Sequence, residues 1–438
     1  MHNLSRSLHR HALRLSAAFA VLTLAGNLSA ATLCVNPGGT AGCQSTITAA
    51  IVASVSGDTI EVQQGTYAPA IITKSISLVA AAGATPIIDA TGKSNGIVVS
   101  GIIATPNAGI GHAVVSGFEV LNANFEGILV INATDVTLVN NHVHNNNKAL
   151  DPSAAKCPNI PAFETSEAMD CGEGIHLMAV DHSYVINNLV ENNSGGILIT
   201  DETGPTTDNV IKGNIVHDNG YACGITMASH PAANGSGPIK ALNYGISHNV
   251  ISQNQSYDNG LLLPGAGAGV GIFAPGPGSS NTGNAVIYNL LYGNGLPGVT
   301  MHNHAAVAGA PPVFFNDNVI VGNTIFGNAA DTADAHTGGT TGINVYSVAR
   351  MDGTVIAENI IQDESIAIAF NAPKNSRLIA HFNNFAGQGI GVDNIGAGFI
   401  DAINNYWGCA DGPSATCNTA NGNNILTTPF LTQAFGSN

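Results

Sequence analysis

Asparagines recur in pairs five positions apart, and this repeat restricts the chain to a coiled architecture. The pairs are Asn141/Asn146, Asn188/Asn193, Asn214/Asn219, Asn254/Asn259, Asn289/Asn294 and Asn323/Asn328. In the next unit Asn359 is followed at the same distance by Glu364. An apolar residue usually stands two places after the first Asn, and a Gly with a β-branched residue follows soon after the second. Each repeat unit is therefore predicted to contain a strand, a turn at Asn, a second strand, a turn at Asn or Gly, and a third strand.

Short strands joined by single residues that tolerate left-handed backbone angles make a chain coil instead of forming hairpins. Stacked coils place equivalent asparagines above one another, where their amides can hydrogen-bond along the stack. The apolar positions then point inward and form one continuous core. The sequence therefore predicts an all-β parallel β-helix, a solenoid of roughly ten to twelve coils at the ~4.8 Å spacing of parallel strands. The regular Asn spacing disfavours the alternative, an antiparallel β-sandwich.

The N-x-V-x-x-N-x-G-I pattern resembles the right-handed parallel β-helix (PbH1) repeats of the pectin-lyase-like superfamily, which includes NosD-like and carbohydrate-binding or sugar-hydrolysis domains. The resemblance extends from about residue 45 to residue 408. It implies a single right-handed β-helix domain over residues 32–438. TITAAIVASVSGDTIEVQQGTY is similar to the start of such proteins, with a short helix near 45–54 covering the first coil. NNYWGCADGPSATC resembles a common closing turn, so Trp407 and residues 404–438 would seal the last coil.

The N-terminus predicts an export signal over residues 1–31. A basic stretch, MHNLSRSLHRHALRLS, precedes the apolar run AAFAVLTLAG and the small residues NLSAA, which is the order of a secretory signal peptide. The apolar run is too short to span a bilayer, and no later stretch reaches the about 18 apolar residues that a transmembrane helix needs. We expect a secreted or periplasmic protein without a membrane span, and a monomer.

The charge balance limits the classes of partner. The chain has 12 Lys and Arg against 28 Asp and Glu, a net charge of −16, and the predicted signal carries three of the arginines. A strongly acidic protein is a poor ligand for nucleic acids and for anionic membranes. Charged residues make up only 9% of the chain, so its surface must be rich in uncharged polar residues. This composition suits a repetitive extracellular β-structure better than a helical enzyme.

Seven cysteines in an exported chain predict disulfides. The pairs closest in sequence are Cys34–Cys43, Cys157–Cys171 and Cys409–Cys417. Each pair brackets a Gly- or Pro-rich segment, so three local bridges are the simplest arrangement. Cys223 is then left over, and we expect it to be a small buried residue. Other connectivities stay open, because the sequence does not fix the pairing.

Loop lengths and strand register indicate candidate functional residues. Extra residues between repeats fall at 148–172, 201–208, 229–243, 302–316 and 330–341, and loops on a rigid scaffold are where sites are usually built. Most of them adjoin a Gly-Ile strand, so they would wall a groove over one sheet. Several polar residues lie four to six places after the Gly that opens such a strand, and so share similar positions in the coil. They are Asp201, Glu202, His230, His302 and His304, with His176 earlier in its strand and Tyr346 in the register of His302.

These residues predict acid–base chemistry on an extracellular polysaccharide. Carboxylates with histidines can act on a glycosidic bond or on a sugar C5 proton, as in a polysaccharide lyase, glycoside hydrolase or epimerase. We expect Asp201 or Glu202 as acid or base, with His230 and His304 orienting the substrate or sharing the proton transfer. The expected substrate-binding residues are His176, His302 and Tyr346. A uronate substrate would require Ca²⁺ to bridge its carboxylates to this acidic chain.

Two other functions remain open, and whether the protein is an enzyme is not fixed by the sequence. A non-catalytic surface or matrix protein would bind glycans or adhere through aromatic rings exposed along a groove, but aromatics are only 5% of the chain. The resemblance to NosD-like proteins implies a periplasmic metal-binding protein, with copper held by His302, His304 and His230 and by Met301 or Met227. The NTD…DD…GHG…RIK series of polygalacturonases and the DPHD motif of alginate epimerases are missing.

Overall fold

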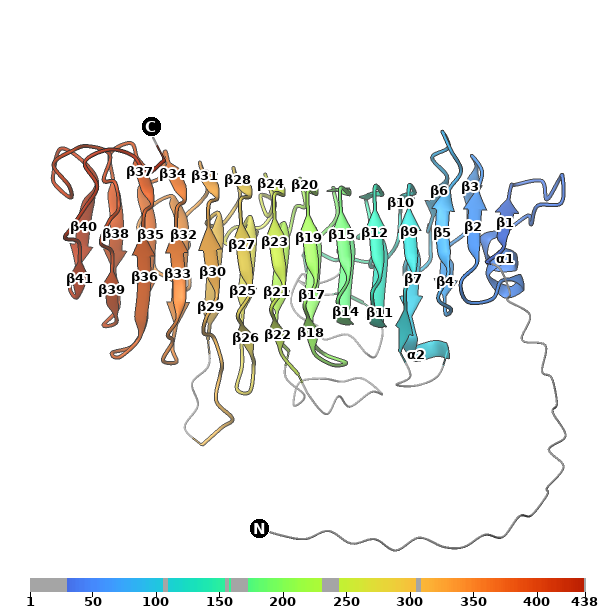
Figure 1. Ribbon diagram of the computed structural model, residues 1–438, viewed down its shortest axis with the longest axis horizontal. Coiled ribbons are helices and arrows are strands. Elements are labelled where there is room, and N and C mark those ends of the chain that lie inside the picture. The colour runs from blue at the N-terminus through green and yellow to red at the C-terminus, as the bar shows by residue number, and fades with distance from the viewer. Residues whose placement is uncertain are drawn as a thin grey trace, which may run out of the picture.

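The computed structural model describes residues 30–104, 109–153, 157–158, 172–230, 244–304 and 309–436, and they form one long parallel β-helix (Figure 1). The predicted export signal, residues 1–31, lies outside the described residues except for its last two positions. None of the helices in the described part of the chain is long and apolar enough to cross a membrane.

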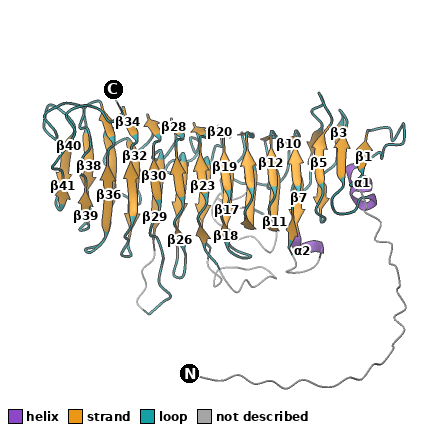
Figure 2. Ribbon diagram, in the orientation of Figure 1, coloured by secondary structure: helices purple, strands orange, loops and turns teal. Residues whose placement is uncertain are grey.

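Three parallel sheets make up the faces of the solenoid, and almost all regular structure in it is strand (Figure 2). In the first sheet the order is β1 (Thr32–Val35), β2 (Thr59–Val62), β5 (Ser77–Ala80), β9 (Val114–Ser116), β12 (Thr137–Val139), β15 (Tyr184–Ile186), β19 (Val210–Lys212), β23 (Val250–Ser252), β27 (Ala285–Ile287), β30 (Val319–Val321), β33 (Thr354–Ala357), β36 (Arg377–His381), β39 (Phe399–Asp401) and β41 (Ile425–Leu426). In the second it is β3 (Thr66–Tyr67), β6 (Ile87–Asp89), β10 (Glu119–Leu121), β13 (His142–His144), β16 (Leu189–Glu191), β20 (Ile215–His217), β24 (Gln255–Tyr257), β28 (Leu290–Tyr292), β31 (Thr324–Phe326), β34 (Ile360–Gln362) and β37 (Asn384–Ala386).

The third sheet has the longest strands and carries the candidate site. Its members are β4 (Ala70–Ile72), β7 (Ile97–Ser100), β8 (Ile110–Gly111), β11 (Ile128–Thr134), β14 (Ile175–Asp181), β17 (Ile197–Thr200), β18 (Thr206–Thr207), β21 (Ile225–Ala228), β22 (Ile246–Ser247), β25 (Val270–Phe273), β26 (Asn281–Thr282), β29 (Val299–Asn303), β32 (Thr341–Ser347), β35 (Ile366–Asn371), β38 (Ile390–Asn394) and β40 (Thr419–Gly422). A short helix, α2 (Gly101–Ala104), follows β7.

The second sheet has 11 strands, within the roughly ten to twelve coils that the sequence predicts. The first sheet runs through 14 strands, because β1, β39 and β41 at its two ends have no counterpart among the strands of the second sheet.

The predicted asparagine ladder is confirmed. Asn254 is buried, and its amide donates to Asn289 Oδ1 and to the Ile211 carbonyl, each at 3.0 Å. Its own Oδ1 accepts from the backbone N–H and the side-chain amide of Asn214, at 2.9 and 3.0 Å. The left-handed backbone angle falls on the residue before each ladder position, as at Asn187, where φ is 54°. The turn and the ladder therefore use two neighbouring residues, because the ladder amide must point inward while the turn residue faces solvent.

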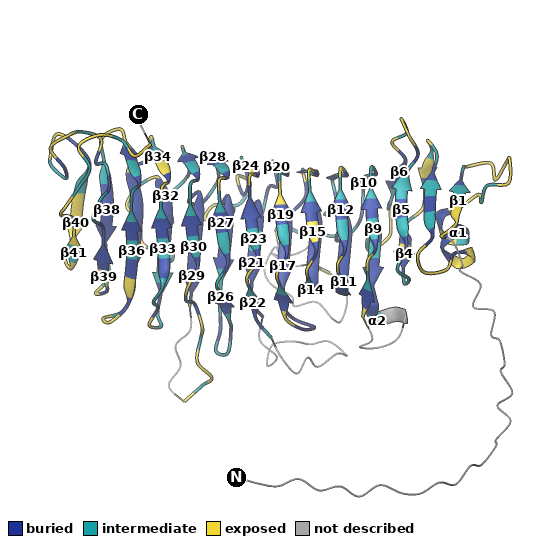
Figure 3. Ribbon diagram, in the orientation of Figure 1, coloured by how far each residue is buried: buried dark blue, intermediate teal, exposed yellow. Residues whose placement is uncertain are grey.

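The apolar residue of each repeat lies in the core, as predicted. These residues occupy equivalent positions in the second sheet and are fully or almost fully buried. The ribbon in Figure 3 is coloured as buried along much of the strands. They are Val143, Val190, Val216, Leu291, Ile325 and Ile361. A single hydrophobic cluster extends through the described coils, so the burial of apolar surface is continuous along the rod.

The first coil is covered by a short helix, α1 (Ile47–Ala53), inside the predicted range of 45–54. Thr46 caps its N-terminus by accepting a hydrogen bond from the Ala49 N–H, and Ile47 and Ile51 are buried beneath it. Figure 1 shows α1 beside β1, at the opposite end of the solenoid from the C-terminus. It covers the open end of the core, where unpaired strand edges would otherwise be exposed.

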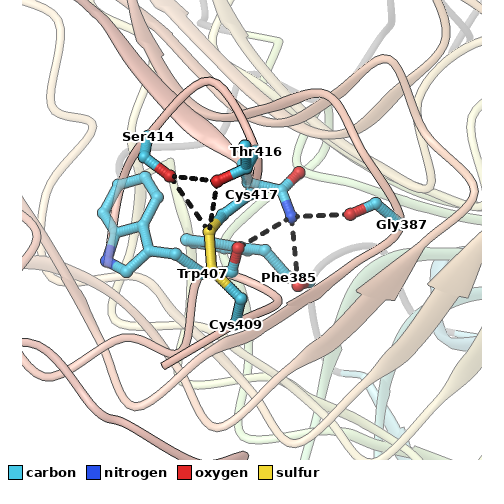
Figure 4. Close-up of a disulfide and its surroundings, with 8 residues drawn as sticks. Phe385, Gly387, Trp407, Cys409, Ser414, Thr416 and Cys417 are labelled. Carbon is cyan, nitrogen blue, oxygen red and sulfur yellow. Dashed lines mark hydrogen bonds between the residues drawn. A yellow bond between two sulfur atoms is a disulfide. The ribbon is translucent and has the colours of Figure 1, made fainter. Parts of the chain in front are cut away.

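The closing turn buries Trp407 completely, as the sequence predicts. Its ring meets Phe385 edge-on, with centroids 5.2 Å apart. The Cys409–Cys417 disulfide closes the loop beside it (Figure 4). The Asn418 amide donates to the carbonyls of Phe385 and Gly387. This loop therefore seals the core at the end of the last coils.

Two of the three predicted disulfides are present, Cys34–Cys43 and Cys409–Cys417, which fits an oxidising compartment. The third predicted pair includes Cys171, which lies outside the described residues, so the Cys157–Cys171 bridge stays a prediction. Cys223 is buried and takes no part in either described bridge, as expected.

Glu364 occupies the ladder position where other coils have Asn, and this predicts a pH-dependent stability. Its Oε1 accepts from the backbone N–H and the amide of Asn328 at 2.9 and 3.1 Å. Burial raises the pKa of Glu364 to about 7, although the hydrogen bonds from Asn328 lower it. The unfolded chain ionises near the ordinary value of 4.5, so the native protein loses stability as the pH rises from there to about 7.

We therefore expect Glu364→Gln to be more stable than the wild type at pH 8, by roughly 1 to 3 kcal/mol, and to show little difference at about pH 4.5. Chemical unfolding at the two pH values measures this difference. Glu358→Gln, at an exposed turn position of the same coil, is the matched control and should show no such gain. An equal gain for Glu364→Gln at both pH values would contradict the ionisation argument.

Candidate functional site

The outer face of the third sheet carries two rows of side chains that alternate with the core positions. Strand register places equivalent residues side by side across the coils. One row is Leu129, His176, Leu198, Thr226, Gly271, Thr300 and Asn344. The other is Ile131, Met178, Thr200, Ala228, Phe273, His302 and Tyr346. Most of these residues are buried although they lie outside the core.

A cavity of about 540 Å³ lies over the middle of this face. Leu198, Ala228 and Phe273 supply apolar lining from β17, β21 and β25. Cys223 belongs to a small hydrophobic cluster with Leu296 at the same cavity, which accounts for its burial. The titratable groups that line the cavity besides Tyr221 and Cys223 are Glu173, His302, His304 and Asp334. An apolar cavity with a few convergent polar groups is the usual form of a binding site.

His302 is held between two carboxylates at this cavity. Its Nε2 lies 2.5 Å from Asp331 Oδ2, and its Nδ1 lies 3.3 Å from Asp334 Oδ2. The amide of Asn344 also donates to Asp331 Oδ2, at 3.0 Å. His304 Nε2 lies 3.3 Å from the same oxygen of Asp334. His302 is buried, whereas the His304 side chain is 43% exposed, so His304 is the histidine that a ligand can reach.

The electrostatics favour a protonated His302. Burial alone would lower the pKa of His302, but the hydrogen bonds to Asp331 and Asp334 outweigh it and the pKa is raised. The bond to His302 in turn lowers the pKa of Asp334. Both ring nitrogens of an imidazolium donate, which matches a ring that faces a carboxylate on each side.

A second group, made of Asp201, Glu202 and His230, is buried where β17 and β21 end. His230 Nδ1 lies 3.1 Å from Glu202 Oε1. Burial would raise the pKa of Glu202, but the charge and hydrogen bond of His230 outweigh it and lower the pKa. Asp201 Oδ2 accepts from the Ser229 hydroxyl at 2.9 Å and from the Gly245 N–H at 2.6 Å, and its Oδ1 accepts from the His230 N–H.

His176 extends this group across the sheet. Its Nε2 lies 2.8 Å from the Thr200 hydroxyl, and its charge helps to lower the pKa of Glu202 after the larger effects of burial and His230. On its other side, His176 Nδ1 is 3.9 Å from Glu126 Oε1. The buried group therefore spans neighbouring coils and joins the ends of several strands.

The structure thus divides the predicted residues into two groups. Asp201, Glu202 and His230 come together as the register predicts, with His176 beside them. His302, His304 and Tyr346 belong to the cavity group, where the Tyr346 ring lies 6.1 Å from each histidine ring. Glu202 and His230 contact each other, whereas the described ion pair of His304 is with Asp334. The convergence of all four predicted catalytic residues in one place stays a prediction.

Asp331, Asp334 and Phe273 are functional candidates that sequence reasoning missed. The two aspartates lie in the loop after β31, which carries no repeat, so counting from the strands could not reach them. Their D-x-x-D spacing, after the H-x-H of His302 and His304, is the signal that was available. The predicted copper set is also not assembled, because Met227 and Met301 point into the hydrophobic core while His302 faces outward.

Comparisons with known proteins agree with this architecture. A family model described as right handed beta helix region matches residues 80–237. The chain is a right-handed parallel β-helix protein. This is the fold that the repeat predicts.

Similar solved structures include pectate lyase Pel9A, with a TM-score of 0.52 and 15% identity over 86% of this chain and 80% of that one. The Dettilon tailspike protein matches with a TM-score of 0.53 and 14% identity, over 91% of this chain and 68% of that one. Geobacillus virus E2 ORF18 matches with a TM-score of 0.50 and 14% identity, over 83% and 62% of the two chains. These likenesses show the fold alone. No curated protein matches the β-helix protein by sequence.

Aromatic rings on the second sheet form a stack. His217, Tyr257, Tyr292 and Phe326 follow one another on adjacent strands, with centroids 4.7 to 5.0 Å apart and interplanar angles of 4 to 6°. Each inner ring therefore has its faces covered by its neighbours. Sugars stack on the exposed face of an aromatic ring, so this stack supports the coils and does not make the aromatic groove expected of a binding rod.

Two groups of described residues have the composition of a metal site. One is His302, His304 and Asp334, and the other is Glu119, His142 and His144 on the outer face of the second sheet. In the first group both ring nitrogens of His302 already face carboxylates, which suits an imidazolium better than a metal ligand. Each group contains two imidazoles, which favour transition metals over Ca²⁺.

Proposed function

We propose that the β-helix protein hydrolyses an extracellular polysaccharide in the cavity over the third sheet. The observation that carries the proposal is the His304–Asp334 pair, at 3.3 Å, on the border of an apolar cavity of about 540 Å³. A histidine aligned by a carboxylate is a common general base or acid. The fold is shared by a pectate lyase and by a tailspike protein, so the fold alone does not determine the activity. The proposal therefore depends on the residues that line the cavity.

In this mechanism the His304–Asp334 pair takes a proton from the water that attacks the anomeric carbon. The glycosidic C–O bond breaks, and the leaving oxygen receives a proton from the second carboxyl group of the cavity, Glu173. His302, held as a cation between Asp331 and Asp334, fixes Asp334 in place. Water supplies the hydroxyl that remains on the sugar, so the atoms balance.

The charge of the cavity favours a neutral sugar chain over a uronate. Among the described residues, the lining contains Glu173 and Asp334 but no Lys or Arg, so these two carboxylates would repel a uronate carboxylate. An elimination or an epimerisation at C5 needs the uronate carboxylate to be neutralised, which an added cation would do. The expectation that Ca²⁺ accompanies a uronate substrate is therefore tested separately, by assays with and without Ca²⁺.

The test is a screen of the purified protein against neutral and uronic-acid polysaccharides, with and without Ca²⁺. We expect new reducing ends from a neutral polysaccharide and no increase in the absorbance of unsaturated products. Inactivity towards every polysaccharide in both conditions would refute an enzymatic function. Unsaturated products from a uronate in the presence of Ca²⁺ would replace hydrolysis by elimination.

We further expect His304→Ala to lower kcat/KM by about 100-fold or more, since general acid–base groups contribute effects of that size. His248→Asn is the matched control, because His248 occupies an exposed turn remote from the cavity lining, and we expect wild-type rates from it. Unchanged rates in His304→Ala would remove the catalytic role of the His304–Asp334 pair.

A further inference from the structure

A group of imidazoles and carboxylates lies on the outer face of the second sheet, outside the cavity. His142 and His144 alternate with the core residue Val143 on β13, so both side chains face outward. Strand register places Glu119 of β10 beside His142 and Glu191 of β16 beside His144. Three adjacent strands therefore present four potential ligands on one rigid surface.

The distances within this group suit a small cation. His144 Nε2 lies 3.1 Å from Glu119 Oε1, and His142 Nε2 lies 2.8 Å from Glu191 Oε1. One ligand atom from each of Glu119, His142 and His144 lies within 4.8 Å of the others. Tetrahedral Zn²⁺ with bonds near 2.1 Å holds its ligand atoms about 3.4 Å apart, so closing the group around an ion needs only small side-chain movements.

Neighbouring side chains hold these groups in position. Glu191 Oε2 faces His217 Nε2 at 3.3 Å, and His217 Nδ1 is 2.7 Å from Asp218 Oδ2. His144 Nδ1 is 2.7 Å from Asn145 Nδ2, which holds the ring with Nε2 directed at Glu119. A metal ion at Nε2 requires the proton on Nδ1, so the Asn145 amide would turn to accept it through Oδ1. Hydrogen-bonded partners behind the first ligands are typical of metal sites, because they fix ring orientation and tautomer.

We propose that Glu119, His142 and His144 bind one divalent transition-metal ion of the Zn²⁺ type, and that Glu191, which faces His142 but lies outside the set within 4.8 Å, moves in as the fourth ligand. Two imidazole nitrogens and two carboxylate oxygens match Zn²⁺ and disfavour Ca²⁺, which takes six to eight oxygens. The ion would sit among the carboxylates of Glu119, Glu191 and Asp218, which gives it a favourable field. It would tie β10, β13 and β16 together across three coils and stabilise the stack. This site does not depend on the proposed function.

The test is calorimetric titration of the metal-free, full-length protein with Zn²⁺ alone. We expect one saturable site per chain, with binding at least tenfold weaker in His142→Ala and in His144→Ala. His248→Asn removes an exposed histidine elsewhere and should bind as the wild type does, and Ca²⁺ should not compete. Zn²⁺ should also raise the urea midpoint of the wild type but not that of the two Ala variants.

Glu119→Gln serves as a second, conservative variant, because it keeps the size of the side chain and removes only the charge. Far-ultraviolet circular dichroism establishes that each variant is folded before titration. The proposal is overturned if the wild type shows no saturable site, if the folded variants bind like the wild type, or if Ca²⁺ binds as tightly. It is also overturned if tight binding is lost in His304→Ala instead, since the ion would then belong to the cavity.

Discussion

Asn254→Ala should lower the free energy of unfolding by about 3 to 5 kcal/mol, because it cuts the asparagine ladder in its middle. The substitution removes the acceptor for the Asn214 backbone N–H, which is buried and has its hydrogen bond to Asn254 Oδ1. It also removes the donor to the Ile211 carbonyl. A buried polar group left without a partner costs about 1 to 3 kcal/mol, and the lost side-chain volume adds to this.

Urea unfolding, followed by circular dichroism, measures the effect. Asn187→Ala is the matched control, because Asn187 is exposed and only its left-handed backbone angle favours Asn. We expect it to cost about 1 kcal/mol or less. Equal losses from Asn254→Ala and Asn187→Ala would mean that the ladder contributes nothing beyond turn propensity.

The parts of the fold that follow from local spacing were predictable from the sequence. The ladder position of Asn254, the burial of Val143 and the helix α1 all depend on residues close in sequence and on a repeat that fixes the register. The contact between Glu202 and His230 was predictable for the same reason, since the two residues end adjacent strands at the same level.

The rest of the site depends on the course of the loops and on the directions in which side chains point. Counting residues from the Gly of each strand gives neither. His304 has the same count as His230, yet its partner is Asp334, from a loop outside the repeat. In the coil of Phe273 the Gly-Ile dipeptide is itself shifted: it begins at Gly271, whereas the residue equivalent to Gly196 is Gly269. A low aromatic content could not reveal that Tyr257 and Tyr292 are stacked, since composition carries no positions.

Asp201→Ala should also lower the free energy of unfolding by about 3 to 5 kcal/mol, which would separate a structural from a catalytic role for this predicted acid or base. Burial raises the pKa of Asp201 to about 6, although the His230 N–H lowers it, so the carboxylate is mainly ionised at pH 8. It then accepts from Ser229, His230 and Gly245, and Ala would leave these three buried donors without their acceptor.

Ser229→Ala is the control for this prediction. It removes one of the three donors to Asp201, together with the acceptor of the Ser280 N–H, and leaves the Asp201 carboxylate with its other two donors. We expect it to cost about 1 to 2 kcal/mol. Unfolding at pH 8 gives both values, and the activity per folded molecule of Asp201→Ala should stay within about tenfold of the wild type, well short of the loss that follows removal of a general acid or base. Native stability combined with a 100-fold loss of activity would instead make Asp201 a catalytic group, and would move the reaction from the His304–Asp334 pair to the buried Asp201–Glu202–His230 group.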